Sequence, residues 1–332
     1  MFLKNKFLVS ALVLIVLIFG SFVIYKFYNG QKAEVSGQTS NKVKVGLGPY
    51  ASNIYIYAGI EQGIFARHNI EIDQININTS TDAINALVAN NIDSTGYFSL
   101  DVGLNALISD PNAFKILATG YEKADTDDEM GTSIITKSSS TISSFKDLEG
   151  KKIAVQPSPF AIGVFKNVLT KNGVDLSKVE IVQIVASDQI QILEAGSVDV
   201  AFIYEPYVAI SQSKNFKIVQ SGIYTKYYKD APALAFFISN NLIKNKPEIS
   251  KQYREALTES IEYVNQNRET SMKLLPKYIK IDPEIAPKVK IFTFDDPNKI
   301  NIENIQNYAD FSATQGVLKA KVDVKDLIYT PR

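Results

Sequence analysis

Few side chains of this 332-residue chain could act as a nucleophile or hold a metal ion. The sequence has no cysteine, which excludes disulfides, thiolate metal sites, a cysteine nucleophile and a lipidated cysteine anchor. A Ser-His-Asp triad would have to use the one histidine, His68, and a metal site with two histidines is impossible. His68 lies at the end of a predicted helix, where it can bond the last carbonyls. We therefore expect no catalytic residue and no metal.

A glycine-containing turn after the first predicted strand matches the loose dinucleotide-binding pattern. It reads Gly46-x-Gly48-x-x-Ala51, and Glu71 or Asp73 lies near the spacing expected for an acid that binds ribose. Pro49 stiffens this turn where the backbone would have to approach a pyrophosphate. We expect no nicotinamide nucleotide and no other cofactor.

Candidate ligand-binding residues lie where predicted strands end and helices begin. In open α/β sheets, ligands sit beyond the carboxyl ends of the strands, where loops converge and helix N-termini present N–H groups. This rule selects aromatic, hydroxyl, amide and carboxyl side chains from successive loops. The candidates are Pro49, Tyr50 and Asn53, then Ser80, Thr81 and Asp82, then Tyr97, Phe98 and Ser99, then Gln156, Ser158 and Phe160, then Ser187 and Asp188, and finally Tyr204 and Glu205.

Purely structural roles would also explain several of these candidates. Ser80, Thr81, Ser187 and Asp188 are good helix N-caps. Glu205, which precedes a proline, could simply end a strand. For the tyrosines at loop and strand ends, packing and ligand contact both stay open.

The positions of the four arginines limit the kind of ligand, because none lies in a loop that carries the candidate residues. They are Arg67, Arg254, Arg268 and Arg332. A multiply charged oxyanion is normally met by bidentate guanidinium groups, so its capture here would fall to helix N-termini and hydroxyls. Nitrate, a sulfonate or a carboxylate could still be held that way. The aromatic loops suit a small, partly flat organic solute, which we favour, with the small oxyanion left open.

Short β-branched runs alternate with segments of helical period from Lys42 onward. Strands are predicted over Val43–Leu47, Ile70–Ile77 and Ser94–Phe98, and helices over Ile54–Arg67, Asp82–Ala89 and Leu100–Ile108. This order favours a largely parallel sheet with helices on both faces.

A second series of the same kind follows, which predicts two α/β lobes. Its strands are predicted over Lys151–Val155, Val179–Val185 and Val198–Tyr204, and its helices over Phe160–Asn172 and Asp188–Glu194. A first crossing between lobes is expected near Asp125–Glu129 and Thr132–Thr136, and a return near Ala233–Ile238. Helices near Lys251–Asn267, Glu284–Lys290 and Ile302–Leu318 would pack on the first lobe.

The N-terminus predicts a membrane anchor. Lys4 and Lys6 precede the run Phe7–Tyr25, which has 19 residues without a charge, and Lys26 follows. A helix of this length spans about 28 Å, close to the ~30 Å hydrocarbon core of a bilayer. The bulky end of the run lacks a small-x-small cleavage site, so we expect an uncleaved anchor over residues 1–28. The first lysines favour a cytoplasmic N-terminus, and the polar residues 29–41 are expected to tether an extracytoplasmic body.

Composition is that of an ordinary globular protein, with 45% hydrophobic and 21% charged residues. Basic and acidic residues both number 35, so the formal net charge is zero. No broad basic field recommends nucleic acid, and we expect no such partner.

Several motifs, in this order and spacing, together resemble a known family. They are Val43–Tyr50, Glu61–Phe65 with Asn69–Ile72, Ser80–Ala83 leading to Asn91–Asp93, Asp147–Val155, and Leu193–Tyr207. The chain from Val43 to Thr330 resembles extracytoplasmic solute-binding proteins of the nitrate/sulfonate/taurine type, a group that includes receptors for thiamine-precursor pyrimidines. It departs from them at Pro157-Ser158-Pro159, where relatives often carry a glycine-serine turn, and at Tyr204, where tryptophan is frequent.

The resemblance implies a periplasmic-binding-protein type II fold, with two α/β lobes, two crossings between them and a ligand in the cleft. We place lobe 1 at residues 42–130 and 233–332, and lobe 2 at residues 131–232. The implied function is a receptor that closes by a hinge on a small molecule and delivers it to the permease and ATPase subunits of an ABC importer. The alternatives are a membrane-anchored sensory or scaffold module with the same fold, and a pyrimidine-synthesising enzyme relative.

Overall fold

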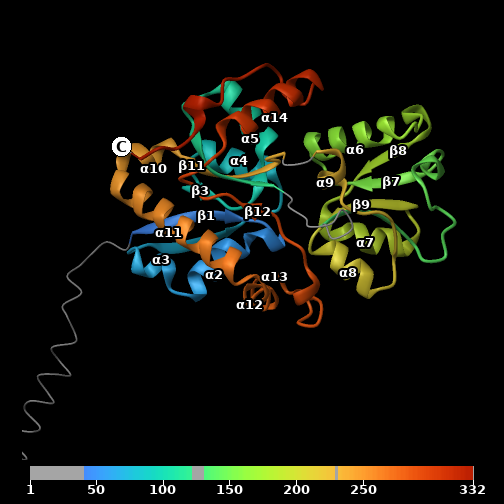
Figure 1. Cartoon of the computed structure of the whole chain (residues 1–332), viewed down its shortest axis with the longest axis horizontal. Coiled ribbons are helices and arrows are strands. Elements are labelled where there is room, and N and C mark those ends of the chain that lie inside the picture. The colour runs from blue at the N-terminus through green and yellow to red at the C-terminus, as the bar shows by residue number, and fades with distance from the viewer. Residues whose placement is uncertain (1–40, 122–130, 229–230, 332) are drawn as a thin grey trace, which may run out of the picture. The chain divides into compact units, whose positions relative to one another are not determined.

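The computed structural model describes residues 41–121, 131–228 and 231–331 (Figure 1). Residues 42–332 form one compact unit. The predicted anchor (1–28), the predicted tether (29–41) except Asn41, and the acidic stretch Asp125–Glu129 lie outside the described residues. Within the described ranges, no helix combines the length and the apolar character that crossing a membrane requires.

The first sheet has seven strands in the order β12-β5-β11-β3-β1-β2, with β4 paired to β11. Their bounds are β1 Lys42–Leu47, β2 Glu71–Asn76, β3 Ser94–Thr95, β4 Phe98–Ser99, β5 Phe114–Tyr121, β11 Leu234–Ser239 and β12 Thr293–Phe294. Strand β1 is parallel to β2 and β3, whereas β11 is antiparallel to β3, β4 and β5. The sheet predicted to be largely parallel is therefore mixed, because β11 returns from the second half of the chain and inserts between β3 and β5.

The second sheet has five strands in the order β10-β6-β9-β7-β8. They are β6 Thr132–Thr136, β7 Lys152–Val155, β8 Glu180–Gln183, β9 Val200–Tyr204 and β10 Lys217–Gln220. Strand β7 is parallel to β8 and β9, while β6 is antiparallel to β9 and β10. The pattern of the first sheet recurs, with two parallel neighbours around a central strand and an antiparallel strand beyond. The chain therefore builds two α/β units.

Glycine and a threonine cap set the bounds of the helices that follow the first strands. The helices are α2 Ile54–Glu61, α3 Ile64–Arg67, α4 Ser80–Val88 and α5 Leu100–Ser109, with a 3-10 turn at Ala51–Asn53. The single helix predicted over Ile54–Arg67 is broken, because Gly63 adopts a left-handed φ of 65°. Thr79 caps α4, since its hydroxyl accepts the backbone N–H of Asp82.

Helices cover both faces of the second sheet (Figure 1). They are α6 Pro159–Lys171, α7 Ala186–Ala195, α8 Tyr207–Ser213 and α9 Ile223–Tyr227, with 3-10 turns at Phe145–Leu148 and Leu176–Lys178. Successive residues of β9 point to opposite faces, so Phe202 packs with Phe165 of α6, whereas Ile203 packs with Leu193 of α7. This alternation explains why the whole strand is apolar.

The C-terminal segment packs on the first sheet and its helices. It contains α10 Asn240–Asn245, α11 Pro247–Gln266, α12 Arg268–Met272, α13 Leu275–Ile279, 3-10 turns at Ala286–Lys288 and Lys325–Leu327, and α14 Ile302–Thr314. Helix α11 lies against α2, where the Ser260 hydroxyl donates to the Tyr55 carbonyl and Gly59 leaves no room for a Cβ. The helix predicted near Glu284–Lys290 is wrong, because only one 3-10 turn forms before the chain extends into β12.

Candidate functional site

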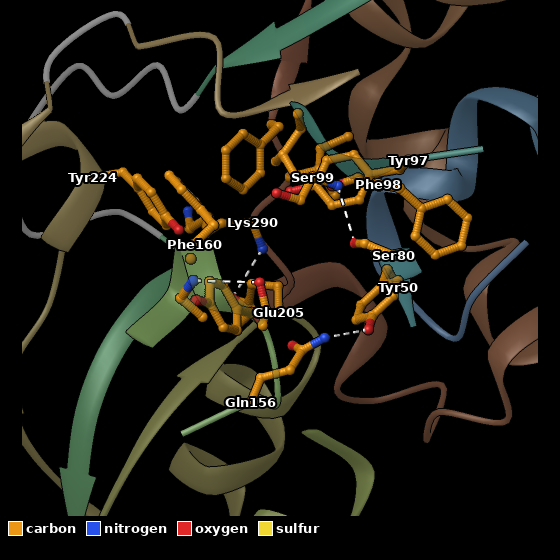
Figure 2. Close-up of a pocket in the computed structure, with 18 residues that line it drawn as sticks. Tyr50, Ser80, Tyr97, Phe98, Ser99, Gln156, Phe160, Glu205, Tyr224 and Lys290 are labelled. Carbon is orange, nitrogen blue, oxygen red and sulfur yellow. Dashed lines mark hydrogen bonds between the residues drawn. The ribbon is translucent and has the colours of Figure 1, made fainter. Parts of the chain in front are cut away.

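A cavity lies where loops from both sheets converge (Figure 2). It contains about 680 Å³ free of protein atoms, its opening to solvent included. The first sheet and its loops contribute Tyr50, Ser52, Ser80, Tyr97, Phe98, Ser99 and Leu234. The second contributes Gly131, Gln156, Ser158, Phe160, Ala161, Tyr204, Glu205 and Tyr224, and the segment before β12 contributes Lys290, Ile291 and Phe292.

Most of the candidates predicted from the sequence line this cavity. They are Tyr50, Ser80, Tyr97, Phe98, Ser99, Gln156, Ser158, Phe160, Tyr204 and Glu205. They come together because the strands before them end at the same edges of the two sheets, as the rule for open α/β sheets requires. Their role in binding a ligand remains a prediction.

The other predicted candidates lie outside the cavity lining, and local contacts account for most of them. Asn53 is buried, donates to the Gly48 carbonyl at 2.7 Å and accepts the Tyr97 N–H at 2.9 Å, so it holds two loops together. Asp82 bonds the hydroxyl of Thr79, and the Ser187 hydroxyl donates to Asp188 at 2.9 Å. Pro49, Thr81, Asp82, Ser187 and Asp188 are absent from the lining.

Sequence reasoning missed part of the lining. The missed residues are Ser52, Gly131, Ala161, Tyr224, Leu234, Lys290, Ile291 and Phe292. Ser52 and Ala161 are neighbours of predicted candidates, so a wider window would have found them. The segment Lys290–Phe292 gave no such signal, because it was expected to end a helix and its approach to the cavity is a tertiary effect.

Tyr50 and Gln156 connect the loops of the two sheets across the cavity (Figure 2). The Gln156 Nε2 donates to the Tyr50 phenolic oxygen at 2.8 Å, and this hydroxyl donates in turn to the Asn78 carbonyl at 3.0 Å. Burial raises the pKa of Tyr50 to about 12, so the phenol is neutral and can act as donor and acceptor together.

Ser99 places a hydroxyl without a partner in the cavity wall. It is only 5% exposed, and its Oγ has no hydrogen-bond partner among the described residues. Its backbone N–H donates to the Ser80 Oγ at 3.1 Å, which fixes the loop. A buried hydroxyl without a partner costs stability, and a ligand that bonds it would remove that cost.

Glu205 is held in the cavity wall by two backbone donors. The Ala209 N–H donates to Oε2 and the Lys290 N–H to Oε1, both at 3.1 Å. Burial raises the pKa of this carboxyl to about 8, although both N–H groups and the Lys290 charge act in the opposite direction. A Cβ at Gly131 would lie 2.7 Å from the Glu205 Cγ, so only glycine fits there without a shift.

Aromatic rings form much of the remaining wall. Phe160 stacks on Tyr224 with ring centroids 5.6 Å apart and planes 14° apart. Tyr97 meets Phe292 edge to face at 5.3 Å, and Tyr50 meets Tyr97 at 6.3 Å. Such a wall suits a flat or apolar organic body, and few polar groups are available to orient it.

The described residues offer little to a metal ion or an anionic cofactor. Within the described ranges, no group of three or more His, Asp or Glu side chains is placed to hold a metal. Among the described lining residues, Glu205 and Lys290 are the acidic and basic side chains, and no arginine is present. His68 lies elsewhere, with its Nε2 2.8 Å from Glu259 on the surface of α11.

Two α/β units whose strand ends share a cavity define a two-lobed, periplasmic-binding-protein-like fold. The chain belongs to the family described as NMT1/THI5 like, whose sequence profile matches residues 51–271. This match confirms the family resemblance read from the sequence.

Similarity extends over most of the chain. A protein of Brucella abortus (strain 2308), named as a binding protein, is 23% identical over 276 residues, covering 80% of this chain and 83% of that protein. The alkanesulfonate-binding protein SsuA from Xanthomonas axonopodis pv. citri, solved bound to MOPS, superposes with a TM-score of 0.70 at 16% identity, covering 87% of this chain and 98% of SsuA.

The same fold also occurs in an enzyme. The desulfurization enzyme DSZB superposes with a TM-score of 0.64 at 13% identity, covering 86% of this chain and 95% of the enzyme. Fold likeness therefore does not by itself separate receptor from enzyme, and the residues of the cavity must decide.

Proposed function

We propose that this protein is an extracytoplasmic solute-binding receptor that delivers a small organic solute or a small oxyanion to an ABC importer. One observation carries the proposal: a cavity is lined by loops from both sheets and contains a buried Ser99 hydroxyl without a described partner. A solute there would contact both α/β units and bond that hydroxyl. The binding protein of Brucella abortus and the sulfonate receptor of the same fold support this reading.

The proposed mechanism is hinge closure of lobe 1 (42–130 and 233–332) on lobe 2 (131–232). A solute that touches both lobes binds the closed form more tightly, and therefore shifts the population toward it. The Gln156–Tyr50 hydrogen bond and the contact of α6 with α14 would form on closure. The importer's permease and ATPase subunits would then recognise the closed form.

An uncleaved N-terminal helix is proposed to hold the receptor at the outer face of the cytoplasmic membrane. The support is the sequence itself, in which Phe7–Tyr25 is uncharged and long enough to cross a bilayer. An anchored receptor would stay close to its permease at a high effective concentration.

Two alternatives use the same fold. An anchored sensory or scaffold module would use the same fold and the same closure, and differs only in its partner. An enzyme is favoured by the shared fold of DSZB, yet the described cavity holds neither a histidine nor a cysteine. The receptor reading needs no reactive side chain, so it fits the lining better.

The test uses the full-length chain in detergent micelles with a solute panel. Pyrimidines, sulfonates, nitrate and amino acids are screened by thermal shift, since a ligand that binds only the folded state raises Tm by mass action. Closure is then measured by pulsed EPR between spin labels at Gln191→Cys on α7 and Glu262→Cys on α11, which are the only cysteines in such a variant. Binding without shortening of this distance would contradict hinge closure, and no binding to any solute would contradict the receptor assignment.

A further inference from the structure

We infer that Glu205 determines specificity, selecting solutes that are neutral or cationic and carry an N–H or O–H donor, and rejecting oxyanions. This inference rests on the proposed function and names the chemical class of its ligand. It separates this chain from the sulfonate-binding protein of the same fold.

The geometry makes Glu205 a fixed acceptor. Each carboxyl oxygen accepts one backbone N–H, from Lys290 at Oε1 and from Ala209 at Oε2, both at 3.1 Å. An ionised carboxyl has about four lone-pair positions, so each oxygen keeps one for a further donor. The two backbone bonds and the close approach of Gly131 prevent the side chain from turning away from the cavity that it lines.

The charged side chains of the lining also bear on whether an oxyanion can bind beside Glu205. Among the described lining residues no guanidinium group faces Glu205. Lys290 also lines the cavity: its backbone N–H bonds Glu205, and its charge acts to lower the pKa of that carboxyl without offsetting the effect of burial. Above the raised pKa of about 8, an oxyanion beside Glu205 would therefore meet a like charge, which weakens its binding. Below that pKa the carboxyl holds a proton and this repulsion is absent.

The rest of the lining limits the ligand to one with few polar groups. The Ser99 hydroxyl can donate or accept one bond, and the nearby rings of Phe160, Tyr224 and Phe292 offer apolar surface. A compact or planar organic body that ends in an amine, amide or amidine group satisfies both features. Its N–H groups would bond Glu205, and its body would lie against the rings.

The test compares three ligands that share one ring and differ in charge: benzamidine, benzamide and benzenesulfonate. Each is titrated by calorimetry into the full-length chain in detergent at pH 8.5 and pH 6. At pH 8.5 we expect benzamidine and benzamide to bind at least about tenfold more tightly than benzenesulfonate. The preference should narrow at pH 6, because protonation of Glu205 removes its charge.

Glu205→Gln supplies the second arm, with Glu180→Gln as its control because Glu180 is exposed on β8 and outside the lining. The amide can accept only one of the two backbone N–H groups, so the variant is compared by its ratio of affinities rather than by stability. We expect the ratio of benzamidine to benzenesulfonate affinity to fall about tenfold in Glu205→Gln and to stay constant in Glu180→Gln.

The outcomes separate this inference from the proposed function. If benzenesulfonate, or only anions in the wider solute panel, bind best at both pH values, then Glu205 does not select donors and the inference is overturned, while the receptor assignment stands. The inference is also overturned if the ratio of benzamidine to benzenesulfonate affinity changes neither with pH nor in the Glu205→Gln variant. If no member of the panel or of the ring series binds, the receptor assignment fails and the inference fails with it.

Discussion

The side chain of Gln156 donates a 2.8 Å hydrogen bond to the hydroxyl of Tyr50, which lies 106 residues earlier in the chain. Gln156 follows β7 of the second sheet, and Tyr50 follows β1 of the first. The bond therefore joins the corresponding loops of two similar α/β units. The same tyrosine hydroxyl donates to the Asn78 carbonyl in its own lobe. Gln156 is therefore linked through Tyr50 to the backbone that follows β2 of the first sheet.

Removing this bond should weaken ligand binding through closure. Gln156→Ala deletes a hydrogen bond worth about 1 kcal/mol, which corresponds to roughly a fivefold increase in Kd for the solute found in the panel. Calorimetry measures the change, and Gln212→Ala on α8, exposed and outside the cavity, is the control. Unchanged affinity in Gln156→Ala would show that the bond does not contribute to the bound state.

Elements marked by their own residue pattern were predictable from the sequence. Elements that depend on pairing with a strand far away in the chain were not. Strands β1, β7 and β9 and helix α6 lie within two residues of their predicted ends, because apolar alternation and turn residues mark them. Strand β5, Phe114–Tyr121, escaped prediction, and its place in the sheet depends on β11, more than 100 residues later. Likewise, Glu205 was found from its place at a strand end, whereas its partner Lys290 is brought there by tertiary contacts that no local pattern encodes.

A wedge between α6 and α14 should favour the open form. A Cβ at Gly163 would lie 3.0 Å from Val317, just after α14, and Asn167 on the same helix donates to Gln315 at 3.1 Å. Gly163→Leu adds bulk at this contact, and overpacking of about 1 to 3 kcal/mol would weaken ligand binding roughly tenfold. The EPR distance should lengthen in the variant without ligand.

The matched control for this wedge is Lys166→Leu, at an exposed position of the same helix. It adds a leucine to α6 without meeting α14. Equal affinity and equal EPR distances in Gly163→Leu and in the control would exclude α6 and α14 as a closing contact.

Removing the Ser99 hydroxyl should separate stability from binding. Because its Oγ has no partner among the described residues and Ser99 makes no side-chain cap to α5, Ser99→Ala loses no bond in the unliganded chain. The free energy of unfolding should stay constant or rise by up to about 1 kcal/mol, while solute affinity falls roughly fivefold. Urea unfolding and calorimetry measure the two quantities. A destabilised variant with full affinity would mean that the hydroxyl serves the fold.

Stability should fall as pH rises from about 4 to 8. Burial raises the pKa of Asp101 to about 6 from 3.8, and that of Glu205 to about 8 from 4.5. The folded chain therefore holds protons that the unfolded chain releases, so each pH unit in this window lowers the free energy of unfolding by up to about 1.4 kcal/mol per group. The contribution is complete below the unfolded pKa values and is lost once pH passes the folded ones.

Urea unfolding between pH 4 and pH 9 tests this dependence, and Glu205→Gln divides it between the two acids. In the variant the decline should end near pH 6, where Asp101 has ionised, whereas the unmodified chain should continue to lose stability to about pH 8. Asp101 serves as an internal reference, since its Oδ2 accepts the Tyr308 hydroxyl at 2.6 Å and Glu205→Gln replaces neither partner. A decline that continues to pH 8 in Glu205→Gln would assign the upper transition to another group.

The N-terminal run should remain on the mature protein as its membrane anchor. Phe7–Tyr25 ends in bulky residues rather than at a small-x-small cleavage site, and the chain has no cysteine for lipidation. Mass spectrometry of the protein extracted from membranes should therefore find a peptide that includes Lys26 and the residues before it. Inserting an Ala-Gln-Ala cleavage site after Ser21 should release the body from the membrane fraction, whereas Ser21→Ala alone should not. A native mature N-terminus near Ala33 would show instead that the run is a signal peptide, and the receptor would then need another means of staying near its permease.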